Sequence, residues 1–223
     1  MALRRTYGQG CGTAFALDVI GDRWALLVVR ELVLGPKRFT DLRDGLPGIG
    51  PNVLSQRLKE LEDADVIRRR VLPPPAASTV YELTEWGSEL EEVIVQLARW
   101  GARSPDLPRE AETQAEWVVL GLRALYDPDG EPKPASYELR FGDEVFWASV
   151  DGGPLRVGRG TASNPDAVLD SDPETIARLV QGALKPAAAL KSGALSLEGD
   201  RRALDRFLSL FRFPPSGAAA IRG

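Results

Sequence analysis

Apolar side chains in the first hundred residues recur every three to four positions, in runs that glycine and proline interrupt. This period is that of an amphipathic α-helix with one buried face. Gly35 and Pro36 end one run, and Pro51 begins another, because proline at the first helical position sacrifices no hydrogen bond. The pattern predicts four helices, over residues 11–20, 23–34, 38–45 and 51–64.

A hairpin and a long helix are predicted next. Runs of β-forming residues at 67–72 and 79–83 are joined by a proline-rich loop, which is typical of two paired strands. Thr84 then provides an N-cap for a helix that we expect to run to about residue 102. Four helices, a hairpin and a long helix, in this order, are typical of a winged helix with an added C-terminal helix. The long helix carries one apolar stripe, formed by Leu90, Val93, Ile94, Leu97 and Trp100.

The pattern changes between residues 101 and 108, where GARSPDLP contains a glycine and two prolines. We place a domain boundary here, between residues 1–103 and residues 109–223. The second part mixes helical and β-like runs. Helices are expected at 117–126, 172–183, 186–190 and 200–210, and strands at 136–141, 144–150, 154–159 and 194–198. The predicted fold class is α+β, with an N-terminal winged helix-turn-helix domain and a C-terminal α+β domain that has an antiparallel sheet.

Composition narrows the possible functions. The chain has 223 residues, no histidine and one cysteine, which excludes histidine-based catalysis, histidine metal ligands and cysteine zinc clusters. We therefore expect no enzyme, no metal and no cofactor. No apolar run approaches the roughly 18 residues that cross a bilayer, and no signal peptide is visible, so we expect a cytoplasmic protein.

The charges are unevenly distributed. The net charge is −4, yet residues 1–103 hold 14 basic and 14 acidic side chains, whereas residues 104–223 hold 14 and 18. Within residues 23–70 there are ten basic and seven acidic side chains. Because phosphate contact depends on the local field, the acidic total does not exclude DNA binding.

The helix at 51–64 has a polar face opposite its leucines. Short or amide-bearing side chains with one cation suit the base edges and phosphates of a major groove. Any surface helix has a polar face, but here a short helix precedes it and a basic hairpin follows. The predicted reading residues are Asn52, Ser55, Gln56 and Lys59.

The hairpin carries three consecutive arginines. Strand alternation predicts that Ile67 and Val71 point inward, so that Arg69 shares their side while Arg68 and Arg70 face outward. Outward arginines on a wing can enter a minor groove or contact its phosphates. The alternative is that they only protect a sheet edge.

Three further cations lie near these elements. Lys37 and Arg38 precede the short third helix, where a cation and backbone N–H groups together suit a phosphate, and Arg38 joins the predicted DNA-binding residues. Arg57 is left out of that set, because it has Glu60 and Asp63 as acidic neighbours.

Residues 11–101 resemble the HxlR-type regulators, which are relatives of the MarR group. The resemblance rests on ALDVIGDRWALLVVRELVLGPKRFTDLRDGLPGIGPNVLSQRLKELEDADVIRRR, followed by YELTEWG and LARWG. It implies a homodimeric winged helix-turn-helix protein that binds double-stranded DNA and acts on nearby genes. The helix at 51–64 would enter the major groove, and residues 67–83 would form the wing. Asp65 departs from the family, which commonly has glycine in the turn before the wing.

The resemblance bears on two further features, the apolar stripe of the long helix and Cys11. The first and last helices of the family's domain form its dimer contact, so a second copy is expected to cover the stripe on the long helix. The alternative is that the second domain packs on this stripe. Cys11 lies where related proteins can carry a redox-active cysteine, but we interpret it as a small, buried structural residue and keep redox control as an alternative.

Residues 109–213 resemble the sterol carrier protein fold, mainly through DAVLDSDPETIARLVQG and SGALSLEGDRRALDRFLSLF. The resemblance implies an apolar tunnel for a lipid-like small molecule. Ordinary core packing is the alternative for each candidate lining residue. These candidates are Phe141, Trp147, Phe207, Leu208 and Phe211.

The sequence thus indicates a homodimeric DNA-binding transcription regulator controlled by an apolar ligand in its second domain. A purely structural second domain is the alternative.

Overall fold

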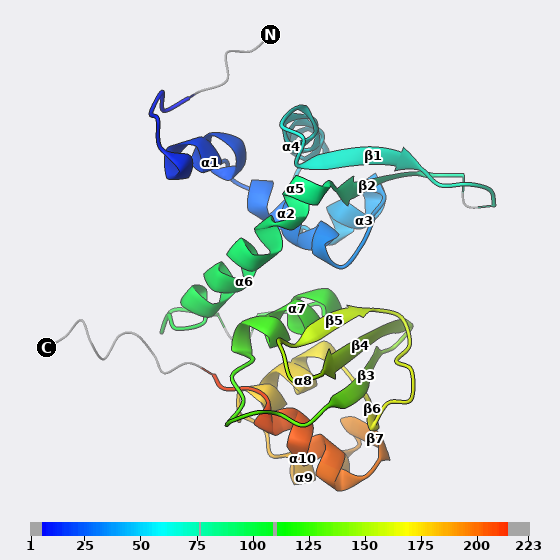
Figure 1. The fold of residues 1–223 in the computed structure, drawn as a ribbon. Coiled ribbons are helices and arrows are strands. Elements are labelled where there is room, and N and C mark those ends of the chain that lie inside the picture. Colours follow the sequence, from blue (N-terminus) through cyan, green and yellow to red (C-terminus); the bar gives the residue numbers. More distant parts are fainter. Residues whose placement is uncertain (1–5, 76, 109–110, 214–223) are drawn as a thin grey trace, which may run out of the picture. The chain divides into compact units, whose positions relative to one another are not determined.

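The computed structural model describes residues 6–75, 77–108 and 111–213 (Figure 1). The chain divides into two compact units, Met1–Ile94 and Val95–Gly223. This division falls inside a helix, so the domain limits predicted from the sequence, 1–103 and 109–223, remain a proposal.

The first unit has the helix and strand order predicted for a winged helix. Its core is formed by Leu42 of the third helix, Val28 and Val29 of the second, and leucines of the fourth, all at most 2% exposed. Contacts join the fourth helix to the first, the second and the first strand. The elements are α1 (Gly12–Ile20), α2 (Ala25–Val33), α3 (Phe39–Asp44), α4 (Pro51–Asp63), β1 (Ile67–Val71), β2 (Thr79–Leu83), α5 (Glu85–Ser88) and α6 (Leu90–Gly101), the last of which continues into the second unit.

The single helix predicted from residue 84 to 102 is wrong, because Glu89 separates α5 from α6. The amide of Glu89 donates to the carbonyl of Trp86, three residues back, which tightens the turn. Gly87 lies directly against the carbonyl oxygen of Val66, so that any larger residue there would collide with the backbone. Thr84 caps α5 as predicted and accepts a hydrogen bond of 2.9 Å from the Gly87 amide.

The hairpin extends beyond the helices. Arg69 lies opposite Tyr81 and Arg68 opposite Glu82 in the antiparallel register. Ile67 is buried as predicted, but the prediction that Val71 points into the core is wrong, since Val71 is 70% exposed. The core ends before the hairpin tip, so alternation no longer implies burial there.

The second unit is a five-stranded sheet with helices (Figure 1). The strand order is β5-β4-β3-β6-β7, and only β3 and β6 are parallel, so the sheet is mostly antiparallel as predicted. The sequence pattern did not predict β6, which lies between β3 and β7 in the sheet. The elements are α7 (Ala115–Leu125), β3 (Ala135–Phe141), β4 (Glu144–Val150), β5 (Arg156–Arg159), β6 (Ala167–Ser171), α8 (Pro173–Val180), α9 (Pro186–Ser192), β7 (Leu195–Gly199) and α10 (Arg201–Ser209).

One face of this sheet packs against α10. Tyr137, on β3, is fully buried and meets the ring of Phe207 edge to face at a centroid distance of 4.9 Å. Phe207 also contacts Phe211 at 5.0 Å. Ser136 and Glu138, which flank Tyr137 on β3, point to the opposite face of the sheet, because strand residues alternate between faces.

The turn before the hairpin generates a prediction. Asp65 has a φ of +58°, in the left-handed region that favours glycine. Asp65→Gly should raise the free energy of unfolding by about 0.5–1 kcal/mol, whereas Asp65→Val should lower it by about 1–2 kcal/mol. Urea unfolding of the full chain measures both changes.

Asp63→Gly is the matched control. Asp63 lies in the helical backbone of α4, where glycine costs stability, so this change should lower the free energy of unfolding by about 0.5–1 kcal/mol. Equal effects of glycine at 63 and 65 would contradict the strain assigned to Asp65.

Candidate nucleic-acid interface

Helix α4 presents its polar face to solvent. Leu54, Leu58 and Leu61 are buried on the opposite side, with at most 2% of their surface exposed. Pro51 begins the helix after Gly50, as the sequence indicated. All four predicted reading residues, Asn52, Ser55, Gln56 and Lys59, are exposed on this helix.

Two of these residues differ in how firmly they are held. The amide of Gln56 donates to Glu60 at 3.0 Å, one turn further along the helix. Lys59 makes no hydrogen bond or ion pair with any described residue, so its ammonium group is available. Arg57 pairs with Glu60 at 2.7 Å, as expected, and also with Asp22 rather than Asp63.

Arg68 and Arg70 share one carboxylate on the hairpin. Both lie 2.8 Å from Glu82 of the paired strand, while their own side chains stay 66% and 47% exposed. Burial of the Glu82 carboxyl would raise its pKa, but hydrogen bonds from both arginines and their charges outweigh burial and hold that pKa below its ordinary value. Glu82 therefore stays ionised and cancels one of the two positive charges.

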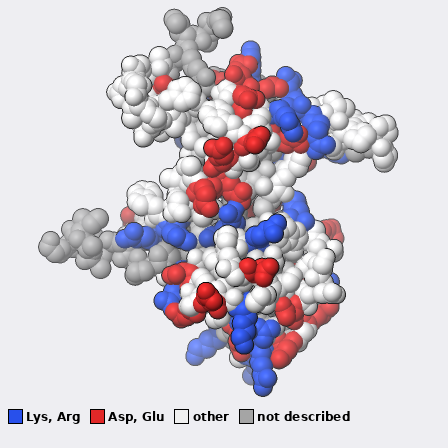
Figure 2. All heavy atoms as spheres, in the orientation of Figure 1, with Lys and Arg blue, Asp and Glu red and all other residues white. Residues whose placement is uncertain are grey.

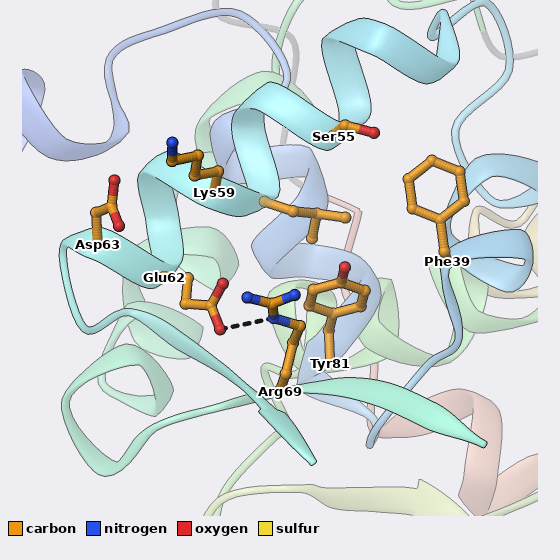
Figure 3. A pocket seen from close by; sticks show the side chains of 8 residues that line it. Phe39, Ser55, Lys59, Glu62, Asp63, Arg69 and Tyr81 are labelled. Carbon is orange, nitrogen blue, oxygen red and sulfur yellow. Dashed lines mark hydrogen bonds and ion pairs between the residues drawn. The ribbon is translucent and has the colours of Figure 1, made fainter. Parts of the chain in front are cut away.

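Arg69 lies on the other face of the hairpin, toward α4, as alternation predicts. It forms a 2.9 Å ion pair with Glu62 of α4, and its hydrogen bond to Glu62 raises its pKa (Figure 3). Tyr81 of β2 lies beside it. Arg69 was not among the DNA-binding residues predicted from the sequence, although strand alternation was a signal that could have placed it next to α4.

The start of α3 joins the hairpin. Backbone hydrogen bonds of 3.0 and 2.8 Å connect residue 37 to Tyr81 in both directions. Arg38 is exposed at this start, but the interpretation of Lys37 as a phosphate contact is wrong. The Lys37 side chain is 9% exposed and forms a 2.6 Å ion pair with the buried Glu31. The sequence pattern gave no sign that Glu31 turns inward.

Positive and negative side chains are interleaved on the face of this unit that Figure 2 shows. Figure 2 shows lysine and arginine gathered at the base of the hairpin with acidic residues beside them, and an uncharged hairpin tip. The field at the candidate interface is therefore set by individual pairs rather than by one broad basic patch.

The apolar stripe on α6 is only partly buried. Ile94 is 7% exposed, whereas Val93, Leu97 and Trp100 are 43%, 45% and 74% exposed. Leu90 is half-buried. Trp100 shows the largest exposed fraction of the large apolar side chains in the described part of the chain.

The candidate ligand residues of the second unit do not share one side of the sheet. Phe141, Phe207 and Phe211 are buried on the face that carries Tyr137, and Leu208 is half-buried. Trp147 lies on the opposite face, because it pairs with Glu138 and its ring lies over Gly158. The prediction that all five line one tunnel is wrong for Trp147. The apolar run of β4 hid this alternation.

Cys11 is exposed, so its interpretation as a buried structural residue is wrong. It lies immediately before α1, where the backbone N–H groups of Ala14 and Thr13 lower the pKa of the thiol. Helical spacing could not reveal this exposure, since Cys11 precedes the first helical turn.

The described residues contain no group of three or more histidine, cysteine, aspartate or glutamate side chains that could hold a metal ion. No helix among them is long and apolar enough to cross a membrane.

Comparisons with known proteins match two separate segments of the chain. Residues 19–107 match the model of the HxlR-like helix-turn-helix family, and residues 131–212 match that of the SCP-2 sterol transfer family. The chain is 38% identical to the HTH-type transcriptional regulator YodB of Bacillus subtilis over 85 residues, which are 38% of this chain and 76% of YodB. It is 34% identical to the HTH-type transcriptional regulator YybR of the same organism over 99 residues, 44% of this chain and 79% of YybR.

Among solved structures, the reduced form of YodB is 33% identical, covers 44% of this chain and 97% of its own, and has a TM-score of 0.39. The identity to YodB and YybR, and the large share of each protein that the match covers, establish the family of this chain. The chain belongs to the HxlR-like helix-turn-helix family of transcription regulators, with an SCP-2 domain at its C-terminal end.

Proposed function

We propose that the chain binds double-stranded DNA, with α4 in the major groove and the hairpin β1–β2 as a wing on the adjacent backbone. The observation that carries this proposal is the polar face of α4, which is held toward solvent by the buried leucines behind it. Gln56 offers an amide to a base edge, and Lys59 offers an unpaired cation to a phosphate or to guanine. Arg38, Arg68 and Arg70 provide further positive charge on the flanking elements.

Each residue set has a different task in this proposal. Asn52, Ser55 and Gln56 have short or amide side chains, which distinguish bases by their hydrogen-bonding edges. Cations on α3 and the hairpin contact phosphates, which position the protein without reading sequence. Because Arg68 and Arg70 share Glu82, the free protein presents less positive charge there than its sequence suggests.

We also propose a homodimer that uses the exposed stripe of α6. Large apolar side chains such as Leu97 and Trp100 are unusual on a monomer surface when they form a continuous stripe. A second copy of the same helix would cover them around a two-fold axis. Such a dimer would present two α4 helices to half-sites about one turn of DNA apart.

The polar face of α4 generates a prediction about sequence preference. Gln56→Ala should reduce the ratio of affinities for upstream DNA of its own gene and for scrambled DNA by about 10-fold, since one good amide–base contact contributes about 1–3 kcal/mol. Lys59→Ala should weaken binding to both DNAs and reduce the salt slope by about 0.9. Fluorescence anisotropy over a salt series measures both effects.

Lys191→Ala is the matched control, because Lys191 is an exposed cation of the second unit. It should leave the affinity for both DNAs unchanged. If Gln56→Ala behaves like Lys191→Ala, α4 is not the reading helix.

The apolar stripe of α6 generates a prediction about assembly. Leu97→Glu places a charge in the apolar stripe and should convert the dimer to a monomer in sedimentation experiments, with DNA affinity reduced about 10-fold or more, because burying an unpaired charge is costly. Val71→Glu, an equivalent change at the exposed hairpin tip, should leave the dimer intact. A dimeric Leu97→Glu protein would show that another surface forms the contact.

We further propose that the second domain binds a lipid-like molecule, which shifts DNA affinity. The match to the SCP-2 family model supports this, as does the aromatic interior around Phe207 between α10 and the sheet. A purely structural second domain is the alternative. Such a domain would have no ligand-dependent change in stability.

Oleate is a suitable probe. At 100 times its Kd it should stabilise the full chain by about 2.7 kcal/mol and raise the Tm saturably. Leu208→Trp, which fills space next to this interior, should abolish the rise, whereas Trp147→Ala on the opposite face should keep it. An unchanged Tm with oleate and with other acyl chains would favour the structural alternative.

Redox control through Cys11 is an alternative to ligand control. The exposed thiol and its lowered pKa favour this reading, since the thiolate is the reactive form. A change in DNA affinity upon oxidation that Cys11→Ser removes would support it. Identical binding before and after oxidation would count against it.

A further inference from the structure

A hollow of about 310 Å³ lies between α4, the hairpin and the start of α3 (Figure 3). Arg69 and Tyr81 rise into it from the hairpin, toward α4. It opens beside the polar face of α4, because Ser55 and Lys59 belong to both. Its lining is formed by Phe39, Ser55, Leu58, Lys59, Glu62, Asp63, Arg69 and Tyr81.

The hollow is rich in hydrogen-bond donors. The ammonium of Lys59 and the hydroxyls of Ser55 and Tyr81 make no hydrogen bond to any residue in the described part of the chain. The guanidinium of Arg69 has one partner, the Glu62 carboxylate at 2.9 Å. Figure 3 shows Arg69 and Tyr81 side by side below α4, with the Glu62 carboxylate paired to the Arg69 guanidinium.

The donor set fits a phosphate. A guanidinium forms paired hydrogen bonds with phosphate oxygens as it does with a carboxylate, and hydroxyl groups donate to the remaining oxygens. The Arg69–Glu62 pair is exposed, with 58% and 30% of the two side chains accessible, so the pair itself contributes little to stability. An incoming anion can therefore replace Glu62 with little loss of folding free energy.

We propose that this hollow receives one backbone phosphate of the bound DNA. In the free protein, Glu62 stays paired with Arg69 until the DNA phosphate replaces it. The inference rests on the proposed function, since it assumes that α4 lies in the major groove. It assigns to Arg69 a phosphate contact separate from that of Arg68 and Arg70, which lie on the opposite face of the hairpin with Glu82. Glu62 then limits DNA affinity, because its displacement is part of binding.

The hollow is electrically balanced in the free protein. Lys59 and Arg69 oppose Glu62 and Asp63, so a phosphate meets no net attraction until Arg69 leaves Glu62. Removing the charge of Glu62 without changing its size would leave one positive charge and a free guanidinium. The strength of DNA binding should therefore rise when Glu62 is neutralised, provided that Arg69 is present.

A double-mutant cycle on the full chain tests this. Glu62→Gln should raise the affinity for DNA about 3- to 10-fold, and Arg69→Ala should lower it several-fold and reduce the salt slope by about 0.9. In the Arg69→Ala background, Glu62→Gln should have less than half of its effect on the logarithm of the affinity. Glu85→Gln, an exposed carboxylate outside the hollow, is the control for the general loss of one negative charge.

Two further arms identify the source of the phosphate. A scan of single methylphosphonate substitutions, which remove one backbone charge at a time, should find one position in each half-site that weakens the wild type but not Arg69→Ala. Inorganic phosphate should compete with DNA somewhat better than chloride at equal ionic strength, and this excess should disappear in Arg69→Ala. A scan that finds no such position, together with phosphate competition that depends on Arg69, would overturn the assignment to DNA in favour of a free phosphate.

The outcomes separate this inference from the proposed function. If the wild type prefers its own upstream DNA through Gln56, but Glu62→Gln equals Glu85→Gln, the hollow is not a phosphate site and α4 remains the reading helix. If the wild type binds no DNA at all, both proposals fail. Thermal unfolding of each variant confirms that the folded chain is being compared.

Discussion

The burial of one side of α4 is the constraint on which the candidate interface depends. Leu54, Leu58 and Leu61 contribute about 1.5–3 kcal/mol each through burial, so a rotation of the helix that exposed them would cost several kcal/mol. The polar face is therefore fixed in direction, with Gln56 and Lys59 pointing to solvent. The backbone bridge between residue 37 and Tyr81 likewise fixes the start of α3 beside the hairpin. A polar face held in a fixed direction follows from these two restraints, and this is the face proposed to read DNA.

Ion pairs between the hairpin arginines and nearby carboxylates reduce the positive charge beside this polar face. The hairpin arginines have carboxylates within 2.8 or 2.9 Å, Glu82 for two of them and Glu62 for the third. A protein that kept all these cations free would attract any DNA, because phosphate contacts carry no sequence information. Pairing reduces this general attraction in the proposed mechanism and leaves more of the discrimination to α4. The net charge of −4 comes from residues 104–223, so it does not oppose DNA as the proposed partner of the first unit.

Much of the fold was predictable from periodicity, because buried apolar stripes dictate both helices and strands. The departures have local causes that a pattern cannot express. Glu89 bonds three residues back to Trp86 and separates α5 from α6, and Trp147 turns away from the other aromatic candidates because strands alternate. Lys37 was misassigned because its partner Glu31 is buried, and the exposure of Cys11 escaped helical spacing because this residue precedes the first turn of α1. The polar face of α4 was predictable, but the carboxylate partners of the arginines require the three-dimensional register.

Selection of duplexes from a random pool by the full chain, followed by sequencing, tests the central claim most directly. The account predicts enrichment of an inverted repeat whose half-sites lie about one helical turn apart. It also predicts that Gln56→Ala selects a sequence relaxed at one or two positions of each half-site. A pool that remains random after repeated rounds, or the same motif selected by wild type and Gln56→Ala alike, would contradict the assignment of α4 as the reading helix.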